Sequence, residues 1–316
     1  MRHALLFSPQ GSQAPGMGRD LAAHSLAARA AFDEADATLG WPVSELCWAG
    51  PAERLNDTRQ TQPCLLVTSV AAHRALLEAG APAPAVVAGH SVGEYAALVA
   101  AGVLELGAAL RLVARRAELM AAADDQGGMS AIIGLDRVQV EAAVERIGHP
   151  TELVVANDNA PGQVVISGRR DLLLEAGETM LAEGARRVIP LPVSGAFHSP
   201  LMAEVAGMLA EAFESESWHD ASLPVVSNVT TEILVDASRI RALLAEQVRS
   251  PVLWVGCVER MVDSGVDTMI ECGAGAALVG MVRRIAPEIH TATVNDAQSL
   301  ASALDLLGAV PAEARA

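Results

Sequence analysis

The stretch AVVAGHSVGEYAALVA, Ala85–Ala100, places a serine between two glycines where one kind of element gives way to another. Ala85–Ala88 has the pattern of a short buried strand, and Val92–Ala101 carries apolar residues at helical spacing. The residues between them, Gly89–Gly93 (GHSVG), fit the pattern G-x-S-x-G. A sharp turn from strand to helix pushes such a serine outward, and large side chains at the glycine positions would collide. The stretch predicts an α/β fold with Ser91 as nucleophile.

A serine nucleophile needs a base and a group that holds the oxyanion. The helix that starts at Val92 presents free N–H groups and the positive end of its dipole, which suits an oxyanion. Eight histidines compete for the role of base. His198, in the loop VSGAFHSPLM after a predicted strand, is the best candidate, whereas His90 points elsewhere if the turn is an elbow.

The rest of the chain supports an α/β layer with a mainly parallel sheet. His3–Phe7 is predicted to be a buried strand, and helical patterns cover Leu21–Leu39 and Pro63–Ala79. Asp267–Glu271 is predicted to be the last strand, followed by a glycine-rich turn and a helix. Strands that alternate with helices in this way favour parallel pairing.

The middle of the chain has a different pattern, in the order βαββαβ, which is typical of a ferredoxin-like unit. We therefore expect a ferredoxin-like insertion at residues 125–190 in a large α/β catalytic domain made of residues 1–124 and 191–316. The predicted elements are a strand at Met129–Gly134, a helix at Arg137–Ile147, strands at Leu153–Asn157 and Gln163–Ser167, a helix at Leu172–Glu183 and a strand at Arg187–Leu191.

The composition excludes several classes of function. The net charge of −16 argues against nucleic acid and anionic membranes as partners. All 22 basic residues are arginine, which excludes a Schiff-base lysine, a P-loop lysine and a lysine general base. The four cysteines form no CxxC pair, so neither a metal site nor a disulfide framework is indicated, and no cofactor is implied.

Cysteine content and apolar patterns also indicate the cellular compartment. The four cysteines are expected to be reduced, buried thiols, as in a cytoplasmic protein. The N-terminus lacks the pattern of a signal peptide. The most apolar long window, Ala96–Ala114, is interrupted by Glu105, Gly107 and Arg111, so we expect no transmembrane span.

Several motifs together resemble the malonyl-CoA:acyl carrier protein transacylase family. They occur in the family's order and cover nearly the whole chain. The resemblance implies an α/β-hydrolase-like large domain with an inserted ferredoxin-like small domain. The motifs are QGSQ at Gln10–Gln13, QTQP at Gln60–Pro63, GHSVGEY from Gly89, NAPGQVVISG from Asn159, GAFHSP from Gly195, SNVT at Ser227–Thr230, and Gln247 ahead of SPVLW.

The resemblance also implies the roles of individual residues. Ser91 would be the nucleophile, and His198 its base. The backbone N–H groups of Gln10 and Val92 would form the oxyanion hole. Arg116, in RRAELM, would pair with the free carboxylate of a malonyl group, since a planar guanidinium grips a carboxylate with two hydrogen bonds. Without the resemblance, Arg116 would be assigned to a solvated helix face.

Three further roles come from the same source. The backbone carbonyl at Gln247 would orient the histidine, where hydrolases use an acid. Gln62 would line the pocket. Phe197 matches the AFH form that is linked with malonyl rather than methyl-branched units, because its ring would hinder a methyl group; such shape selection is worth about 1–3 kcal/mol.

The chain departs from the family pattern in two loops. The family usually has F-P-G-Q-G-S-Q in the first loop, where this chain has Phe7-Ser8-Pro9-Gln10-Gly11-Ser12-Gln13. The late loop usually reads G-P-G, and here it is Gly273-Ala274-Gly275. Since proline fixes its own backbone and restricts the residue before it, the geometry of the first loop becomes a question for the structure.

The resulting hypothesis is an S-malonyltransferase that moves malonyl from malonyl-CoA to the phosphopantetheine thiol of an acyl carrier protein, by a ping-pong reaction in fatty acid synthesis. The alternatives with related chemistry are a free-standing acyltransferase for a polyketide synthase and a malonate decarboxylase subunit. The alternatives of another class are an acyl-thioester hydrolase and a non-catalytic carrier-binding protein.

Overall fold

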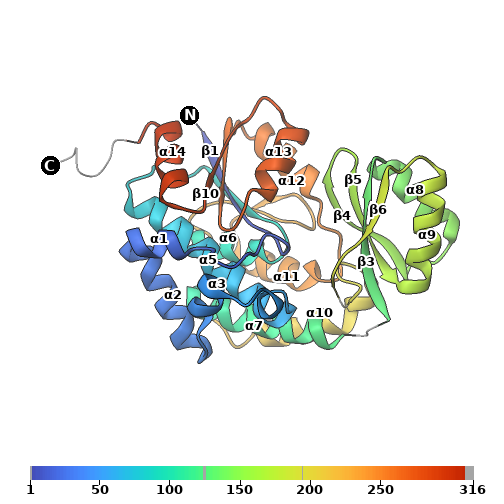
Figure 1. Cartoon of the computed structure of the whole chain (residues 1–316), viewed down its shortest axis with the longest axis horizontal. Helices are drawn as coiled ribbons and strands as arrows, with labels where there is room; N and C mark the ends of the chain where they lie inside the picture. Colours follow the sequence, from blue (N-terminus) through green and yellow to red (C-terminus); the bar gives the residue numbers. More distant parts are fainter. Residues whose placement is uncertain (1, 124–125, 194, 310–316) are drawn as a thin grey trace.

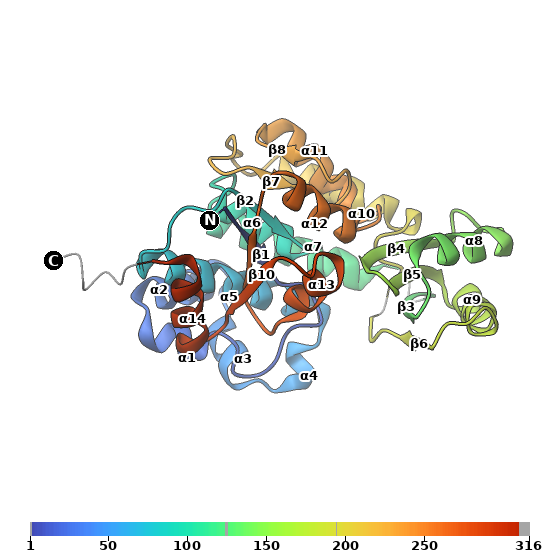
Figure 2. The same ribbon diagram turned by 90° about the horizontal axis from the view of Figure 1, so that it is seen from above.

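The chain folds around two separate β-sheets, as the computed structural model shows for residues 2–123, 126–193 and 195–309 (Figure 1). A six-stranded sheet lies in the larger body, and a four-stranded sheet with two helices lies at one end of the molecule. Figure 2 shows the same separation from above. The predicted boundary between residues 124 and 125 lies outside the described residues.

The larger sheet is mostly parallel, as the alternation of strands and helices predicted. Its strand order is β10-β9-β1-β2-β7-β8, and only β7 and β8 pair in antiparallel fashion. The strands are β1 (His3–Phe7), β2 (Val86–Gly89), β7 (Val225–Val226), β8 (Ile233–Leu234), β9 (Thr268–Cys272) and β10 (His290–Val294).

Helices cover both faces of this sheet, which is why β1 is buried along its whole length. Leu5 and Phe7 face a core shared with α2, α5, α6 and α7, whereas Ala4 and Leu6 face a second core with α12 and α13. The helices of the larger body are α1 (Arg19–His24), α2 (Leu26–Leu39), α3 (Val43–Ala49), α4 (Ala52–Leu55), α5 (Thr58–Glu78), α6 (Gly93–Ala100), α7 (Leu106–Ala122), α10 (Ala203–Phe213), α11 (Ala237–Gln247), α12 (Trp254–Asp263), α13 (Ala277–Ile285) and α14 (Ala297–Leu307), with a 3-10 turn η1 (Pro200–Met202).

One sequence prediction about this sheet is wrong: the strand predicted at Asp267–Glu271, which the structure places at Thr268–Cys272 (β9), is not the last. β10 follows it and pairs with β9 at the sheet edge. The sequence of β10, HTATV, is short of large apolar residues, and only Val294 is fully buried. An edge strand needs less apolar surface than a central one, so its hydrophobic pattern is weak.

The smaller sheet is antiparallel, with strand order β4-β5-β3-β6. Helices α8 (Arg137–Ile147) and α9 (Arg170–Ala182) share a core with it, built from residues such as Ile132, Val140 and Met180. The chain order is β3, α8, β4, β5, α9, β6. The strands are β3 (Gly127–Ile133), β4 (Leu153–Ala160), β5 (Gln163–Arg169) and β6 (Arg187–Pro190).

The smaller sheet contacts the larger body near the end of β4. Irregularities in the pairing of β4 with β5 fall at Val155–Asn157 and Asp158–Ala160. There Asn157 forms an isolated parallel bridge with Val252, a residue of the larger body. Asp158 N donates to Val252 O at 3.0 Å, and Val252 N donates to Ala156 O at 2.9 Å. Backbone hydrogen bonds therefore tie the smaller sheet to the loop after α11.

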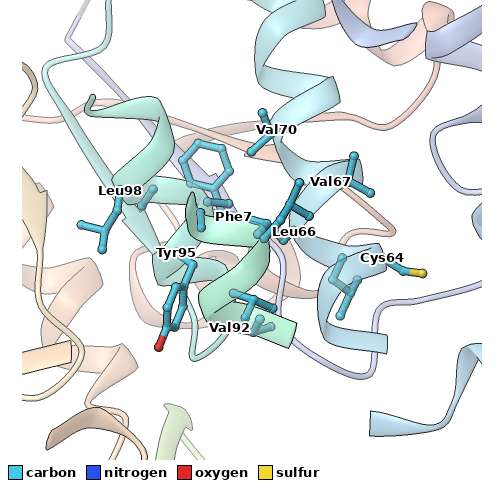
Figure 3. Packing of buried hydrophobic residues seen from close by; sticks show 14 of the residues in the cluster. Phe7, Cys64, Leu66, Val67, Val70, Val92, Tyr95 and Leu98 are labelled. Atoms are coloured by element: carbon cyan, nitrogen blue, oxygen red, sulfur yellow. The ribbon is translucent and has the colours of Figure 1, made fainter. Parts of the chain in front are cut away.

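Helix α6 is packed tightly against the sheet and against α5. Figure 3 shows Val92, Tyr95 and Leu98 among Phe7 of β1 and the apolar residues of α5. This packing fixes the first turn of α6, where the G-x-S-x-G motif ends. No helix within the described residues combines the length and apolarity needed to cross a bilayer.

Candidate active site

Ser91 lies at the sharp turn between β2 and α6. Its backbone φ is 54°, in the left-handed region that costs a non-glycine residue conformational energy. A Cβ atom at Gly89 would lie 1.9 Å from Gly93 O, and one at Gly93 would lie 2.2 Å from Phe7 O. Both contacts are too short for any side chain, so the two glycines are required by the turn, as the sequence predicted.

Asn228 holds the strained turn from outside. Its Oδ1 accepts a hydrogen bond from Ser91 N, and its Nδ2 donates to Gly89 O, each at 2.7 Å. The side chain is fully buried in the loop between β7 and β8. One amide thus pairs the polar backbone groups on both sides of the bend, which would otherwise be buried without partners.

His198 lies directly against the nucleophile. Ser91 Oγ and His198 Nε2 are 2.8 Å apart. His198 Nδ1 faces two carbonyl oxygens, Gln247 O at 2.9 Å and Ser250 O at 3.3 Å. Because carbonyl oxygens only accept hydrogen bonds, Nδ1 carries the proton and Nε2 is free to accept one from Ser91.

The surroundings of His198 keep its ring neutral. Burial, and next the positive charge of Arg116, lower the pKa of His198 to about 3. The backbone has a φ of 58°, and His198 N donates to Val248 O at 2.8 Å. The ring is therefore a neutral base in a fixed orientation near pH 7.

Arg116 reaches the same hydroxyl from α7. Its Nη2 donates to Ser91 Oγ at 3.1 Å and to Gln247 Oε1 at 3.2 Å, and its Nη1 donates to Gln62 Oε1 at 2.6 Å. The residue is 1% exposed, and burial lowers its pKa. Among the described residues, no carboxylate lies within ion-pairing distance of the Arg116 guanidinium. A buried cation held only by neutral groups favours the arrival of an anion.

Gln247 connects the base, the nucleophile and a buried carboxylate. Its side-chain Nε2 donates to Glu94 Oε2 at 2.7 Å and to Ser91 O at 3.0 Å. Glu94 also accepts from Asn228 N at 3.4 Å. Burial raises the pKa of Glu94 to about 7, although Gln247, Asn228 and Arg116 oppose the shift. These hydrogen bonds form a buried polar network beneath the turn.

A cavity of about 110 Å³ opens in front of Ser91 and His198. Gln10 and Phe197 line its wall, as do residues of the smaller body. Gln62 lies behind this wall, where its Nε2 donates to Met120 Sδ and its Oε1 accepts from Arg116, so its place in the pocket lining stays a prediction. The other lining residues are Pro9, His90, Met120, Met129, Asn157, Leu191 and Val193.

The two expected oxyanion donors lie at this cavity or beside it. Gln10 is in the loop after β1 and lines the wall, and Val92 follows Ser91 at the N-terminus of α6. Within the described part of the chain, neither backbone N–H donates a hydrogen bond to another group. Both N–H groups are therefore free to bind a ligand oxygen.

The other histidine of the motif has a different partner. His90 Nε2 lies 2.8 Å from Asn159 Oδ1 of β4, and the His90 ring packs against Trp254. Burial lowers the pKa of His90 to about 4. His90 lines the cavity but makes no hydrogen bond to Ser91, and it joins the turn to the smaller sheet.

Sequence reasoning gave no role to Asn228, Glu94 or Asn159. Each lies inside a motif that supported the family resemblance, namely SNVT, GHSVGEY and NAPGQVVISG. Each is a polar residue in a motif where no side-chain role had been assigned to it. That is the signal that could have pointed to these three residues. The four cysteines are unpaired and buried, as expected. The described residues contain no group of three or more metal-ligating side chains placed to hold a metal ion.

A hydroxyl with a neutral base and a buried cation beside it is suited to accept an anionic acyl group, and it makes this mixed α/β protein an acyltransferase. Comparison with known proteins agrees, since the acyl transferase domain family matches residues 4–303. The malonyl CoA-acyl carrier protein transacylase of Escherichia coli K12 is 41% identical over 305 residues, covering 96% of this chain and 99% of that one. The chain belongs to the malonyl-CoA:acyl carrier protein transacylase family.

Solved structures show the same relationship. An acyl carrier protein S-malonyltransferase from Burkholderia pseudomallei 1710b matches with a TM-score of 0.94 and 39% identity, covering 96% of this chain and 100% of that one. A malonyl transacylase solved in complex with a type II polyketide synthase acyl carrier protein matches with a TM-score of 0.93 and 40% identity, covering 97% and 100%.

Proposed function

We propose that this chain transfers a malonyl group from malonyl-CoA to the phosphopantetheine thiol of an acyl carrier protein, in fatty acid synthesis. The observation that carries the proposal is the position of Ser91 Oγ, 2.8 Å from His198 Nε2 and 3.1 Å from Arg116 Nη2. The relative of known name in Escherichia coli and the solved complex with a carrier protein support the choice of substrates.

The reaction has two matching halves. Ser91 Oγ attacks the thioester carbonyl of malonyl-CoA as His198 Nε2 takes the hydroxyl proton. The tetrahedral intermediate then breaks its C–S bond, and the coenzyme A sulfur leaves with the proton that His198 returns. In the second half, the carrier thiol gives its proton to His198 and attacks the malonyl ester, and Ser91 recovers a proton as its C–O bond breaks. The carbonyl oxygen of Gln247 keeps the ring oriented through Nδ1 in both halves.

Arg116 is assigned to the free carboxylate of the malonyl group. A carboxylate that reaches the buried guanidinium would gain charge-assisted hydrogen bonds, which are stronger away from bulk water. Hydrogen bonds to Gln62 and Gln247 hold the guanidinium in a fixed orientation without neutralising it. An acetyl group has no charge for Arg116 to bind, so the proposal includes selectivity for malonyl.

The oxyanion of each intermediate is assigned to the N–H groups of Gln10 and Val92. Two preorganised donors at this point lower the barrier only when charge develops, which is the requirement for an oxyanion hole. Phe197, on the cavity wall, is assigned to exclusion of methyl-branched units.

We also propose the finer description of the fold. The order β3, α8, β4, β5, α9, β6 and the sheet order β4-β5-β3-β6 support a ferredoxin-like insertion at residues 125–190. Residues 1–124 and 191–316 would then form an α/β-hydrolase-like large domain, with its nucleophile at the turn after β2. A cytoplasmic location, where malonyl-CoA is used, completes the proposal.

Incubation with radiolabelled malonyl-CoA tests the function. The enzyme should acquire a stable label on Ser91 that moves to the thiol of an added holo-carrier protein. Ser91→Ala should abolish the label, while Ser69→Ala, which changes a buried serine that forms no hydrogen bond through its hydroxyl, should keep it. Release of free malonate without a carrier would indicate a hydrolase, and absence of label a binding protein. Parallel arms with fatty acid and polyketide carriers identify the pathway.

A further inference from the structure

The two loops that depart from the family pattern lie side by side in the structure. A Cβ atom at Gly273 would lie only 2.7 Å from Ser8 Oγ, and the φ of Gly273 is +135°. A Cβ atom at Gly275 would lie 3.7 Å from Ser12 O. The loop after β1, which carries Ser8 and Pro9, therefore packs directly on the loop after β9, which carries Ala274.

Ser8 is bonded to the base of that second loop. Its hydroxyl donates to Glu271 Oε1 at 3.0 Å, and the Ser8 side chain is fully buried. Glu271 is the fourth residue of β9 and is 1% exposed. Its other oxygen, Oε2, accepts from Val279 N at 3.0 Å, in the first turn of α13.

Glu271 is itself held firmly from the other side. The N-cap residue of α13, Ala276, has no side chain that could accept from the free N–H groups of the helix. The Glu271 carboxylate takes that place from the preceding strand, where the helix dipole favours a negative charge. Burial raises the pKa of Glu271, and its hydrogen bonds to the α13 backbone and to Ser8 oppose the shift. Ser8 thus donates to a carboxylate, that of Glu271, whose position is fixed by its hydrogen bond to α13.

Pro9 connects Ser8, which is bonded to Glu271, to Gln10. The proline ring fixes its own φ, so one of the two soft dihedral angles of Pro9 is locked. Gln10 is also tied on its far side, because its Nε2 donates to Thr58 Oγ1 of α5 at 3.4 Å. Gln10 thus follows the buried Ser8-Pro9 pair, its side chain is bonded to α5, and its N–H is free.

We propose that Ser8 is a positioning residue for acyl transfer, which fixes the Gln10 N–H at the oxyanion site through its hydrogen bond to Glu271 and the rigid Pro9. The inference rests on the proposed function of Gln10. The family pattern has Pro-Gly at these two positions, whereas this chain has Ser8-Pro9, with a side-chain hydrogen bond and a proline ring directly before Gln10. Ser8 touches neither substrate nor the reacting atoms.

Ser8→Ala tests the proposal, and Ser69→Ala is its matched control. Ser69 is also buried, and its Oγ would lie 2.6 Å from a Cβ atom at Gly273, but the hydroxyl has no hydrogen-bond partner. Acylation of each variant by malonyl-CoA is followed by rapid quench, and kcat and KM of the full transfer are measured. An oxyanion donor acts only in the transition state, so Ser8→Ala should lower the acylation rate and kcat by about tenfold and leave KM within about twofold. Ser69→Ala should match the wild type.

A second variant and a second measurement keep the test decisive. Ser8→Cys keeps a weak donor of similar size and should recover part of the rate lost in Ser8→Ala. Thermal unfolding of each variant shows whether it is folded at the assay temperature. Equal acylation rates for Ser8→Ala and Ser69→Ala, or a rise in KM with unchanged kcat, would overturn the inference. Failure of the proposed function itself has a separate sign, which is label retained in Ser91→Ala.

Discussion

At the residue scale, Ser91 Oγ has two hydrogen-bonding neighbours, one that donates to it and one that accepts from it. Arg116 Nη2 donates a hydrogen bond to it, and His198 Nε2 accepts one from it. A hydroxyl oxygen that receives a bond from a cation is a poorer nucleophile. If a malonyl carboxylate accepted the Nη2 hydrogen bond instead, as proposed, Ser91 would keep only its hydrogen bond to His198. Recognition of the acyl group would then be linked to activation of the serine.

Arg116→Ala tests this link through acyl selectivity. Loss of the cation should lower kcat/KM for malonyl-CoA by about 10- to 100-fold, the value of a charge-assisted hydrogen bond to a buried carboxylate. The kcat/KM for acetyl-CoA should change far less, since acetyl has no carboxylate. The control is Arg115→Ala, which removes a half-exposed arginine paired with Glu118. Equal losses for malonyl and acetyl would reject the assignment of Arg116 to the carboxylate.

Asn228→Ala tests the support of the strained turn. The change leaves Ser91 N and Gly89 O buried without partners, so we expect a loss of about 2–4 kcal/mol in the free energy of unfolding. Because the turn aims the nucleophile, kcat should also fall at least about tenfold. Urea unfolding and the transfer assay measure the two effects.

The control for Asn228 is another polar residue of the same loop. Thr230 bonds only within the turn, to Glu232, so Thr230→Ala should leave both quantities near wild type. If Asn228→Ala lost stability but kept kcat, the two hydrogen bonds of Asn228 would stabilise the fold without aiming the nucleophile.

At the element scale, the junction of β2 and α6 depends on Gly93, the first residue of α6. Gly207 of α10 is a helix glycine in open surroundings and serves as the comparison. A methyl group on Gly93 would meet Phe7 O at 2.2 Å, whereas one on Gly207 of α10 would meet nothing within 4 Å. Gly93→Ala should destabilise by more than about 3 kcal/mol, because β1 or α6 must move. Gly207→Ala should stabilise by about 0.5–1 kcal/mol, since alanine is the better helix former. Paired urea titrations measure both, and the same sign of change in the two variants would contradict this account.

The elements that sequence predicted well are those with strong apolar patterns. β1 and α8 span the predicted residues, since each has a clear pattern and clear ends. The prediction ended β4 at Asn157, but the strand continues to Ala160 through its irregular pairing. The sequence Asp158-Asn159-Ala160 resembles a turn because polar residues there bind the larger body instead of solvent. Such long-range contacts leave no periodic signal.

At the scale of the whole molecule, long-range contacts are also what the sequence-based prediction of the site missed. The motif predicted Ser91, the loop sequence made His198 the best candidate for the base, and the family resemblance added Arg116. Asn228 and Glu94 could not be predicted, because their roles arise only where the β7–β8 loop and α6 meet. The contact of Ser8 with Glu271 spans 263 residues and has no counterpart in local spacing.

The largest whole-molecule consequence is the response of stability to acid. Buried His73, His90 and His198 have pKa values lowered to about 4, 4 and 3 from 6.5. The unfolded chain therefore binds more protons below pH 6.5, and the stability that these groups contribute above pH 6.5 is lost as pH falls. Glu94, with its pKa raised to about 7, acts in the opposite direction between pH 7 and 4.5. Asp158 and Glu271, whose pKa values burial also raises, act with Glu94, and His3, whose pKa burial lowers, acts with the three histidines. The shifts of the three histidines are among the large ones, so we expect stability to fall from pH 6.5 towards pH 4.

His73→Leu isolates one of these groups away from the site. His73 packs edge-on against Phe7 in the core; burial, and next the charge of Arg74, lower its pKa. An apolar residue there needs no proton in either state, so the variant should gain about 2 kcal/mol on the wild type between pH 7.5 and pH 5. Urea unfolding at the two pH values measures this gain, with His24→Gln, which replaces an exposed histidine, as the control. The same difference in unfolding free energy from wild type at both pH values would show that His73 is not the source of the acid sensitivity.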